Sequence, residues 1–443
     1  MRAGWALLRR RDFGLLWAGG LVSETGDWFL LIGLPVWVLQ LTGSSLVTAT
    51  VFLVGLLPGL VVGPLAGVLV DRWDRRRTLV AVGLAQAAFL LPLLVVDGRD
   101  RLWIVYLVMA VEAALGQLNE PARNALVPIL VGPGDLVGAN ALIGLNGNLA
   151  RLVGSPLGGL LVEVAGLPGL VIGDSASFLL GAALFAMVGR RPSPRWSRPW
   201  WFQGPRRGSV ADGEARRPRL STTPLRALAG EWLDGLRVVL GNRELRWGLV
   251  VDGLAAVAQG IFMVLFVLFV TRELGGDGAQ VGLLRGVQAV GGLVGGVLVV
   301  GLARRLEPGR LLGASLVVFG LVSLAIWNGP EVTTAGWVYL GLFMAAGVPG
   351  IGFLTGLTTL VQERTADAYL GRVFATFGGG FNGLMAVGVL LAGLLGDAVG
   401  VVAVLNGQAT LYLLAGLLAV VTLRRPRRDP YPRVSKRARM PLA

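Results

Sequence analysis

The chain has 443 residues, of which 54% are hydrophobic and only 15% are charged, and its mean hydropathy is +0.70. Soluble globular proteins carry about 25% charged residues, so this composition excludes an ordinary soluble fold and indicates a polytopic membrane protein. Neither cysteine nor histidine occurs, which excludes disulfides, thiol chemistry and the usual zinc or haem ligands. We therefore expect no metal or other cofactor, and any proton chemistry must use carboxylates.

Twelve apolar stretches, each close to the ~20 residues that cross a bilayer, follow one another along the chain. Their approximate ranges are 13–40, 46–70, 78–97, 102–128, 138–162, 168–189, 246–271, 279–303, 310–328, 335–361, 372–397 and 401–423. This pattern predicts an all-α integral membrane protein with twelve transmembrane helices. Many of the 67 glycines fall within these stretches, where small residues let helix backbones approach closely.

The basic residues predict the orientation of these helices. An even number of spans places both termini on one side, and 34 of the 40 lysines and arginines lie in the segments on that side. The positive-inside rule makes this side cytoplasmic, so we expect a multi-pass protein of the cell membrane with both termini in the cytoplasm. The net charge of +14 is then a topology signal, and no nucleic-acid partner is expected.

A segment rich in arginine, proline and tryptophan separates the sixth span from the seventh. We predict an N-terminal six-helix half at 1–189, a cytoplasmic linker at 190–245, a C-terminal six-helix half at 246–423 and a basic cytoplasmic tail at 424–443. Within the linker, apolar residues recur at helical spacing between 225 and 240 opposite charged ones. This spacing predicts an amphipathic helix that lies at the membrane surface.

The two halves resemble each other at one fixed offset of 234 residues. The matching pairs are Gly144 and Gly378, Asn148 and Asn382, Gly154 and Gly388, Gly159 and Gly393, Leu160 and Leu394, Leu161 and Leu395, Glu163 and Asp397, Gly166 and Gly400, Gly173 and Gly407, and Gly67 and Gly301. A single ungapped offset that matches polar as well as small residues indicates a duplication. Parallel six-helix repeats are typical of transporters with a substrate site between the halves, near the bilayer midplane.

A short motif, GVLVDRWDRRR, lies where the second span reaches the cytoplasm. It resembles the loop motif of the major facilitator superfamily, Gly-x-x-x-Asp-Arg-x-x-Arg-Arg-Arg, which joins helices 2 and 3. The matching residues are Gly67, Asp71, Arg72, Arg75, Arg76 and Arg77, while Asp74 stands where the family often has glycine. The resemblance implies the major facilitator fold, with two six-helix repeats.

Asp71 is placed at the C-terminal end of a predicted helix, where a carboxylate faces the negative end of the helix dipole and needs a compensating partner. The resemblance implies a latch in which Asp71 meets the start of helix 11, near Gly371 and Arg372, and keeps the outward-facing state closed on the cytoplasmic side. Alternatively, the arginines of the motif act only as positive-inside anchors. The second half keeps Gly301 but has Arg305 in place of the aspartate.

Further segments resemble one branch of the superfamily, which contains macrolide-efflux and enterobactin-exporter-like drug:proton antiporters. These segments are NEPARNALVPILVGPGDLVGANAL, GSPLGGLL, IGDSASFL and LGRVF. The helix 5 motif of antiporters is matched by Gly154, Pro156, Gly158 and Gly159, with the proline one place late. Two earlier glycine positions of that motif are Ala141 and Ala150, and these departures weaken the resemblance to antiporters.

Ionisable residues within the spans are candidates for function, because a charge at a helix centre costs about 2.5–3.5 kcal/mol on insertion scales. Asp27 lies near the middle of the first span, with Glu24 one turn earlier. We expect one or both to handle protons or substrate. The alternative for each is a structural hydrogen bond to a neighbouring helix.

Span 4 carries a polar stripe of Glu112, Asn119 and Arg123, which fall within about 40° of one helix face. Because lipid penalises such a stripe, we expect it to face a wet cavity or partner helices. Arg151 lies midway along span 5 and must find an anion or carbonyls. We expect Glu112 to be its partner, in either a functional or a static ion pair.

Polar residues in the second half complete the candidate set for proton coupling or substrate binding. They are Asp252 and Gln259 on span 7 and Thr355 and Thr359 on span 10. Arg285, with Gln288 nearby on span 8, also lies within a span and, like Arg151, must find an anion or carbonyls. Asp174 is expected to serve helix packing.

These observations predict a secondary transporter that exports amphipathic small molecules by alternating access, by proton antiport. Its partners would be a small-molecule substrate, protons and the lipid bilayer, and we expect a monomer. A facilitator or importer on the same fold is the alternative. An intramembrane enzyme lacks support because no nucleophile motif, phosphate loop or metal-ligand cluster occurs, and a scaffold would not need charges within several spans.

Overall fold

The computed structural model describes residues 6–189, 224–303 and 306–423. Regular structure in these ranges is helical throughout. The helices of the first half are α2 (Arg11–Thr42), α3 (Ser45–Arg72), α4 (Arg75–Leu90), α5 (Leu102–Gly116), α6 (Asn119–Val131) and α7 (Leu136–Met187). They are followed by α8 (Pro224–Gly241), α9 (Arg243–Leu268), α10 (Gly278–Ala303), α11 (Pro308–Trp327), α12 (Gly336–Arg364), α13 (Leu370–Gly396) and α14 (Val401–Thr422).

Ten helical segments in the described part of the chain are long and apolar enough to cross a membrane. One of them, α7, is two helices that meet at Gly166, whose φ of 60° is a backbone conformation that favours glycine. We call these the first limb (136–165) and the second limb (167–187). With both limbs and the 28 residues of α3, each of the twelve predicted stretches has a helical counterpart.

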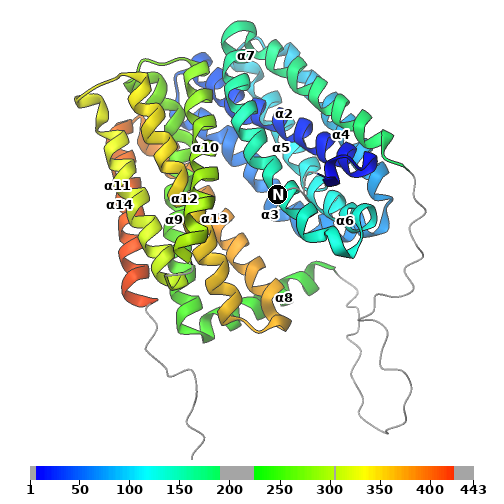
Figure 1. Cartoon of the computed structure of the whole chain (residues 1–443). Helices are drawn as coiled ribbons and strands as arrows, with labels where there is room; N and C mark the ends of the chain where they lie inside the picture. The colour runs from blue at the N-terminus through cyan, green and yellow to red at the C-terminus, as the bar shows by residue number, and fades with distance from the viewer. Residues whose placement is uncertain (1–5, 190–223, 304–305, 424–443) are drawn as a thin grey trace, which may run out of the picture.

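The helices form two bundles (Figure 1). Helices α2 to α7 make the first half and α9 to α14 make the second. Between them in sequence, α8 packs against the start of α13, so closely that a methyl group on Gly235 would lie 2.5 Å from the carbonyl oxygen of Arg372. The predicted amphipathic segment is therefore a helix attached to the second half, although the side chains before Leu233 lie outside the described residues.

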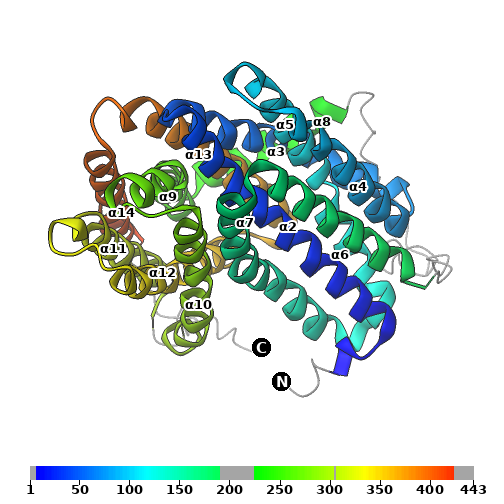
Figure 2. The same cartoon turned by 90° about the horizontal axis from the view of Figure 1, so that it is seen from above.

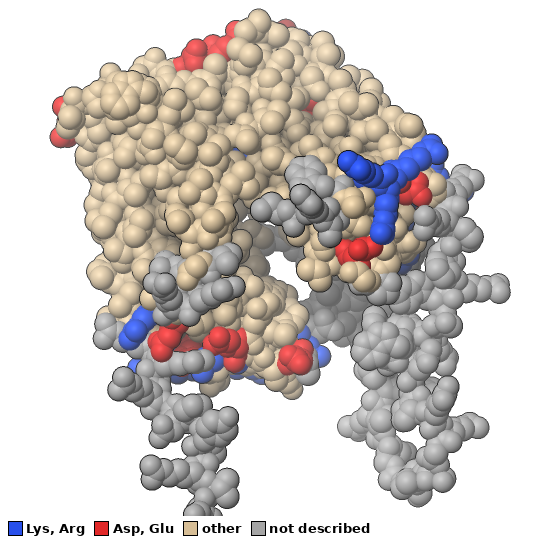
Figure 3. Space-filling view, in the orientation of Figure 1, with Lys and Arg blue, Asp and Glu red and all other residues tan. Residues whose placement is uncertain are grey.

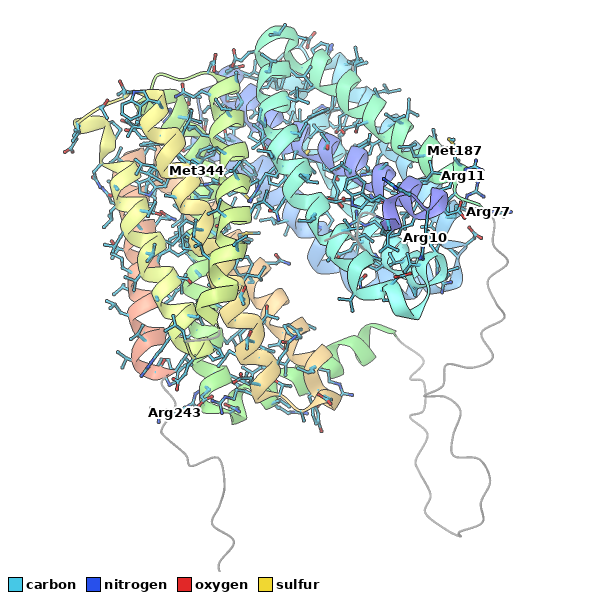
Figure 4. All side chains as sticks on the ribbon, in the orientation of Figure 1. Arg10, Arg11, Arg77, Met187, Arg243 and Met344 are labelled. Atoms are coloured by element: carbon cyan, nitrogen blue, oxygen red, sulfur yellow. The ribbon has the colours of Figure 1, made fainter. Side chains whose placement is uncertain are left out.

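The molecule has two distinct ends. We call the end where α7 finishes and α9 begins the linker face, and the opposite end the closed face. Arg10, Arg11, Arg77 and Met187 gather at the linker face of the first half, and Arg243 lies at that of the second (Figure 4). Charged side chains lie mainly at these two ends, and the halves diverge toward the linker face, leaving a hollow that we call the opening (Figure 3).

Toward the closed face the halves pack directly on one another. The first limb of α7 runs beside α10, and α13 beside α3 (Figure 2). The α7 contact relies on glycine: a methyl group on Gly159 would collide with the carbonyl oxygen of Gly278, and one on Gly282 with that of Ser155. This close approach is the packing for which small residues are selected in membrane helices.

Two carboxylates reinforce this contact between the halves. Glu163 of α7 accepts from the backbone N–H of Gly278, the first residue of α10, at 2.7 Å, and from Gln40 at 2.9 Å. Asp397 accepts from the backbone N–H of Ser45, the first residue of α3, at 2.8 Å. Each carboxylate therefore caps the positive end of a helix in the other half, and the two are equivalent positions of the sequence repeat.

Asp397 has a further partner, because Arg272 forms a 2.8 Å ion pair with it and donates to the Gly43 carbonyl at 2.7 Å. Partial burial acts to raise the pKa of Asp397, but the hydrogen bonds from Arg272 and Ser45 and the charge of Arg272 outweigh it, so the pKa lies below its ordinary value. At the closed face the two halves are thus held together by an ion pair as well as by close packing.

The core of the second half is aromatic. Trp327 is 1% exposed and packs edge-on against Phe269 and Phe343 at centroid distances of 4.9 and 6.1 Å. Its indole N–H donates to Gln408 at 3.1 Å. Aromatic rings supply large contact areas with preferred edge-to-face geometry, so this region is a well-packed body toward the closed face of the second half.

Candidate functional site

A cavity of about 310 Å³ lies mainly in the first half, between α2, α3, α4 and α5, and Met263 of α9 also lines it. Its polar lining consists of Asp27, Gln86, Glu112 and Gln117, and the rest is largely apolar. Asp27 comes from the middle of α2, yet its side chain is exposed, because it points into this cavity. The structure thus brings together Asp27 and Glu112, two of the residues predicted from the sequence.

A second cavity of about 210 Å³ adjoins the first and shares Asp27 with it. Glu24, Asn119 and Arg123 line it, and Arg123 forms an ion pair with Glu24. Both side chains are largely enclosed, with 15% of Arg123 and 23% of Glu24 exposed. The pair neutralises two charges that would otherwise be costly at this depth, so Arg123 is already committed to Glu24.

Three further carboxylates within the spans of this half have no arginine partner among the described residues. Asp27 makes no hydrogen bond or ion pair with a residue that the structure describes. Glu112 is 8% exposed and lies beside Gln86, but neither of its oxygens has a hydrogen bond of normal geometry. Asp174 on the second limb of α7 is fully buried, accepts from Ser177 at 3.2 Å through one oxygen, and leaves the other unpartnered. Buried carboxylates in this condition are candidates for proton exchange.

The stripe predicted on span 4 does face the interior, although the helix that carries it is broken. A turn at Gln117 and Leu118 separates α5 from α6, and Pro121 then lies in the first turn of α6, where its missing N–H is tolerated. Asn119 donates to Gln86 at 3.2 Å. Glu112, Asn119 and Arg123 all line the two cavities.

The expected pairing of Arg151 with Glu112 is wrong. Arg151 donates to Asn148, one turn earlier on α7, at 3.3 Å, and its guanidinium lies 6.0 Å from the Trp28 ring centroid. It points toward α10, since a methyl group on Gly292 would be 3.6 Å from its Nη2. Glu112 lies instead on α5, within the cavity of the first half. A helical wheel cannot reveal this, because it gives the face of each residue and not the neighbouring helix.

The predicted residues of the second half are not part of the acidic cavity. Asp252 is 2% exposed on α9, and Gln259 accepts from the Tyr412 hydroxyl at 3.1 Å. Thr355 and Thr359 are half-buried on α12. The structure therefore separates these four residues from Asp27 and Glu24.

The helix 5 motif packs α7 against two neighbours at once. Methyl groups on Gly154 and Gly158 would lie 2.5 Å from the Thr25 carbonyl oxygen and 2.7 Å from the Phe29 Cα of α2. Pro156 lies against Gly286 of α10, and Gly159 against Gly278. The motif therefore joins the helix that carries Asp27 to the other half.

The loop motif is partly described. The backbone of Gly67, Asp71 and Arg72 belongs to α3, but their side chains lie outside the described residues. Asp74 caps α4 by accepting from the Arg77 N–H at 2.8 Å, and Arg76 donates to the Phe185 carbonyl at 3.1 Å. Arg75 has a buried Nε without a hydrogen bond to a described residue.

The proposed partner of Asp71 has another contact in this structure. Arg372 lies 3.7 Å from a carboxylate oxygen of Asp234 on α8, and its guanidinium is 5.6 Å from the Tyr369 ring centroid. Gly371 has open space around it. The positive charge of Arg372, at the start of α13, is therefore paired with Asp234 of α8 in this structure.

Sequence reasoning missed Gln86 and Gln117, which line the first cavity. Both are polar residues within predicted apolar spans, so the rule that identified Asp27 also applies to them. Within the described ranges, no group of three or more acidic side chains is arranged to hold a metal ion. The arrangement can therefore bind polar groups and exchange protons, and it resembles the polar interior of a membrane transporter.

Comparison with known proteins agrees with this class. Residues 2–196 match the model of a family described as Transmembrane secretion effector, and residues 248–442 match the model described as Major Facilitator Superfamily. The chain belongs to the major facilitator superfamily and is a membrane transporter, not an enzyme.

Its relatives include named efflux proteins. Macrolide efflux protein A of Streptococcus pyogenes is 27% identical over 88% of this chain and 90% of its own length. Multidrug efflux pump Tap of Mycolicibacterium fortuitum is 27% identical over 93% and 96%. Enterobactin exporter EntS of Citrobacter koseri is 26% identical over 95% and 94%. The similarity therefore covers both halves in each case.

Solved structures show the same fold. A bacterial homologue of the iron transporter ferroportin in the inward-facing state matches with a TM-score of 0.70 and 18% identity, over 94% of this chain and 99% of that chain. The same homologue in the outward-facing state gives a TM-score of 0.57 and 19% identity, over 94% and 100%. The arrangement of helices in this chain is thus closer to the inward-facing form.

Proposed function

We propose that this protein exports amphipathic small molecules across the cell membrane by alternating access, in exchange for protons. Its linker face, with both termini, would lie in the cytoplasm, as the distribution of arginines favours. The opening on that face and the higher TM-score against an inward-facing structure support a state ready to receive substrate from the cytoplasm. The efflux activities named for its relatives support the direction of transport.

The observation that carries the proposal is Asp27, an unpaired carboxylate shared by two cavities in the middle of the first half. A carboxylate is stable as an anion while water reaches it. When the halves close around it, the charge loses its solvation and must be neutralised. Taking up a proton removes this cost, so the protonation of Asp27 is coupled to which side of the protein is open.

The charged neighbours of Asp27 have different roles in proton exchange. Arg123 is paired with Glu24 one turn away on α2, which leaves Asp27 free to exchange its proton. Glu112 lines the same cavity and provides a second carboxylate that can hold the proton. A site with two such groups transfers a proton between them without placing a charge in lipid.

Several structural assignments belong to this proposal. The two halves at 1–189 and 246–423 move as bodies, joined by the linker with α8 and followed by the basic tail. Arg372 exchanges its contact with Asp234 for Asp71 when the cytoplasmic side closes. The protein works as a monomer in the bilayer, because each chain holds a complete set of both halves.

Proton release from energised everted membrane vesicles tests the proposal. These vesicles are acidic inside and expose the cytoplasmic face, so a substrate added outside should cause proton release that a pH-sensitive dye records. The panel contains amphipathic cations, macrolides, siderophores and aromatic acids. We expect some of these compounds to evoke release, and Asp27→Asn to abolish it, because the amide cannot carry a proton.

Asp97→Asn is the matched control, since Asp97 is 76% exposed and pairs with Arg101 at the closed face. It should release protons like the wild type. Uptake of a compound without proton release would instead assign the protein as a facilitator. Unchanged proton release in Asp27→Asn would contradict the role given to this carboxylate.

A further inference from the structure

Two arginines, one from each half, lie beside the same Trp28 ring, and neither has an acidic partner among the described residues. Arg285 of α10 donates to Gln288 on its own helix at 2.9 Å, as Arg151 of α7 does to Asn148. Arg151, a second cation, is close enough for its charge to act on Arg285. Two guanidinium groups offer ten N–H donors, so most of this hydrogen-bonding capacity is unused within the described part of the chain.

Aromatic rings hold the two cations in place. The guanidinium of Arg285 lies 5.9 Å from the Trp28 ring centroid and 4.9 Å from that of Phe262. Arg151 lies 6.0 Å from the same indole ring. Cation–π contacts of this kind orient a guanidinium but supply no negative charge, so the site keeps its excess of two positive charges.

The position of the pair makes it accessible from the opening. Along α7 and α10, close contacts run from Gly159 and Gly278 near the closed face to Arg151 and Gly292. Beyond this depth the halves diverge toward the linker face (Figures 1 and 3). Arg151 and Arg285 are each only partly buried. They therefore lie at the inner end of the opening, one from each half.

Unpaired arginines at membrane depth are costly unless an anion joins them. A guanidinium binds a carboxylate or a similar planar anion through two parallel hydrogen bonds, and it stacks on flat rings. Trp28 and Phe262 offer ring faces beside these donors. The chemistry that fits all four side chains is an aromatic ring with a negatively charged group attached.

We propose a binding site for aromatic organic acids, formed by Arg151, Arg285, Trp28 and Phe262. This inference rests on the proposed transport through the opening, and it further specifies that the transported compound is an anion. The anion accepts hydrogen bonds from both arginines and offsets part of their charge, so it links the two halves at the depth where they separate. Trp28 also follows Asp27 on α2, which places the substrate site next to the acidic cavity.

Three probes with one ring system and different charges test the site. We would measure binding of 2-naphthoate, naphthalene-2-carboxamide and 2-naphthylmethylammonium to the purified full-length protein by calorimetry. The wild type should bind naphthoate roughly tenfold or more tightly than the neutral amide, and the cation weakest, because only the anion pairs with both guanidiniums. Equal affinity for the three probes would overturn the proposal.

Variants then locate the site. Arg285→Gln and Arg151→Gln should each weaken naphthoate binding by about tenfold or more and leave the amide unchanged. Arg285→Lys keeps the charge but loses the planar fork, so its affinity should be intermediate. Arg310→Gln is the matched control, because Arg310 is 56% exposed and pairs with Glu307 at the linker face. Thermal unfolding in the same detergent verifies that each variant is folded.

The outcome is separate from that of the proton assay. Asp27→Asn should still bind naphthoate, so a failure of proton antiport leaves the anion site in place. Conversely, proton release evoked only by cations would leave antiport intact and reject the anion site. Naphthoate affinity unchanged in both glutamine variants would show that the arginines serve only packing.

Discussion

The interiors of the two halves differ in how completely their polar groups are satisfied. At membrane depth in the first half, Glu112, Asp174 and Asn146 each keep a buried polar atom without a hydrogen bond to a described residue. In the second half, Asn328 and Asn406 bond each other at 2.9 and 3.0 Å, and Trp327 and Gln408 form a further pair. These polar groups of the second half therefore satisfy one another, whereas several in the first half have no partner among the described residues.

The difference also fits the positions of the cavities. Both acidic cavities lie in the first half, and their polar lining comes from α2, α4, α5 and α6. Unsatisfied polar groups destabilise a protein, so they persist only where another benefit maintains them. Three sets of variants test this contrast between the halves.

The largest effect is expected from Trp327→Ala in the aromatic core. Removing a fully buried indole leaves a cavity and an unpaired Gln408, and large-to-small changes of this kind cost about 3–5 kcal/mol. We expect a strong decrease in the melting temperature in detergent, measured by intrinsic fluorescence or dye binding. Trp337→Ala is the control, because Trp337 is 77% exposed and should melt nearly like the wild type. Equal melting temperatures for both variants would show that the aromatic core contributes no more to stability than the exposed Trp337.

A smaller effect of opposite sign is expected from Glu112→Gln in the first half. The amide fits the same space and carries no charge, so burying it costs less than burying a carboxylate without an ion-pair partner. We therefore expect this variant to melt at or above the wild-type temperature at pH 8 while its proton-coupled transport falls. A clear loss of stability would mean that Glu112 is a structural group like those of the second half.

The smallest effect is expected at the closed face, where equivalent carboxylates of the two halves can be compared. Asp397→Asn should destabilise the protein more than Glu163→Gln, because Asp397 alone is paired with a described arginine. Its pKa is lowered in the folded protein, so its contribution is present above the unfolded pKa of ~3.9 and is lost as the pH falls through the folded value. The melting difference between wild type and Asp397→Asn should therefore shrink from pH 7 to pH 3. A difference that is constant with pH would assign the effect to packing.

Much of the fold was predictable, because each apolar stretch is long enough to show where a helix crosses the membrane. Two departures have local causes. The predicted fourth span is divided into α5 and α6 just before Pro121, and the predicted fifth and sixth spans meet directly at the kink at Gly166. A proline near a helix start and a glycine with positive φ are visible in the sequence, but their exact effect depends on the helices around them.

The site was predictable only in part. Asp27, Glu24 and the stripe on span 4 follow from their polarity within apolar helices, and the structure collects them around two cavities. The partner of Arg151 was predicted wrongly, since a ring face and an amide take the place of the expected carboxylate. The meeting of Arg151 with Arg285 joins residues 134 positions apart from different halves, and no periodicity within one helix contains that information.

Hydropathy, charge distribution and repeat spacing are properties of the chain alone, so they were enough to identify a helical membrane transporter with repeated halves. Which charges are satisfied depends on the folded arrangement of the helices. Helix packing pairs Glu24 with Arg123, leaves Asp27 facing a cavity and places two arginines together at the inner end of the opening. The physical reason is that the cost of a buried charge depends on its neighbours in space, and these are set by how helices pack.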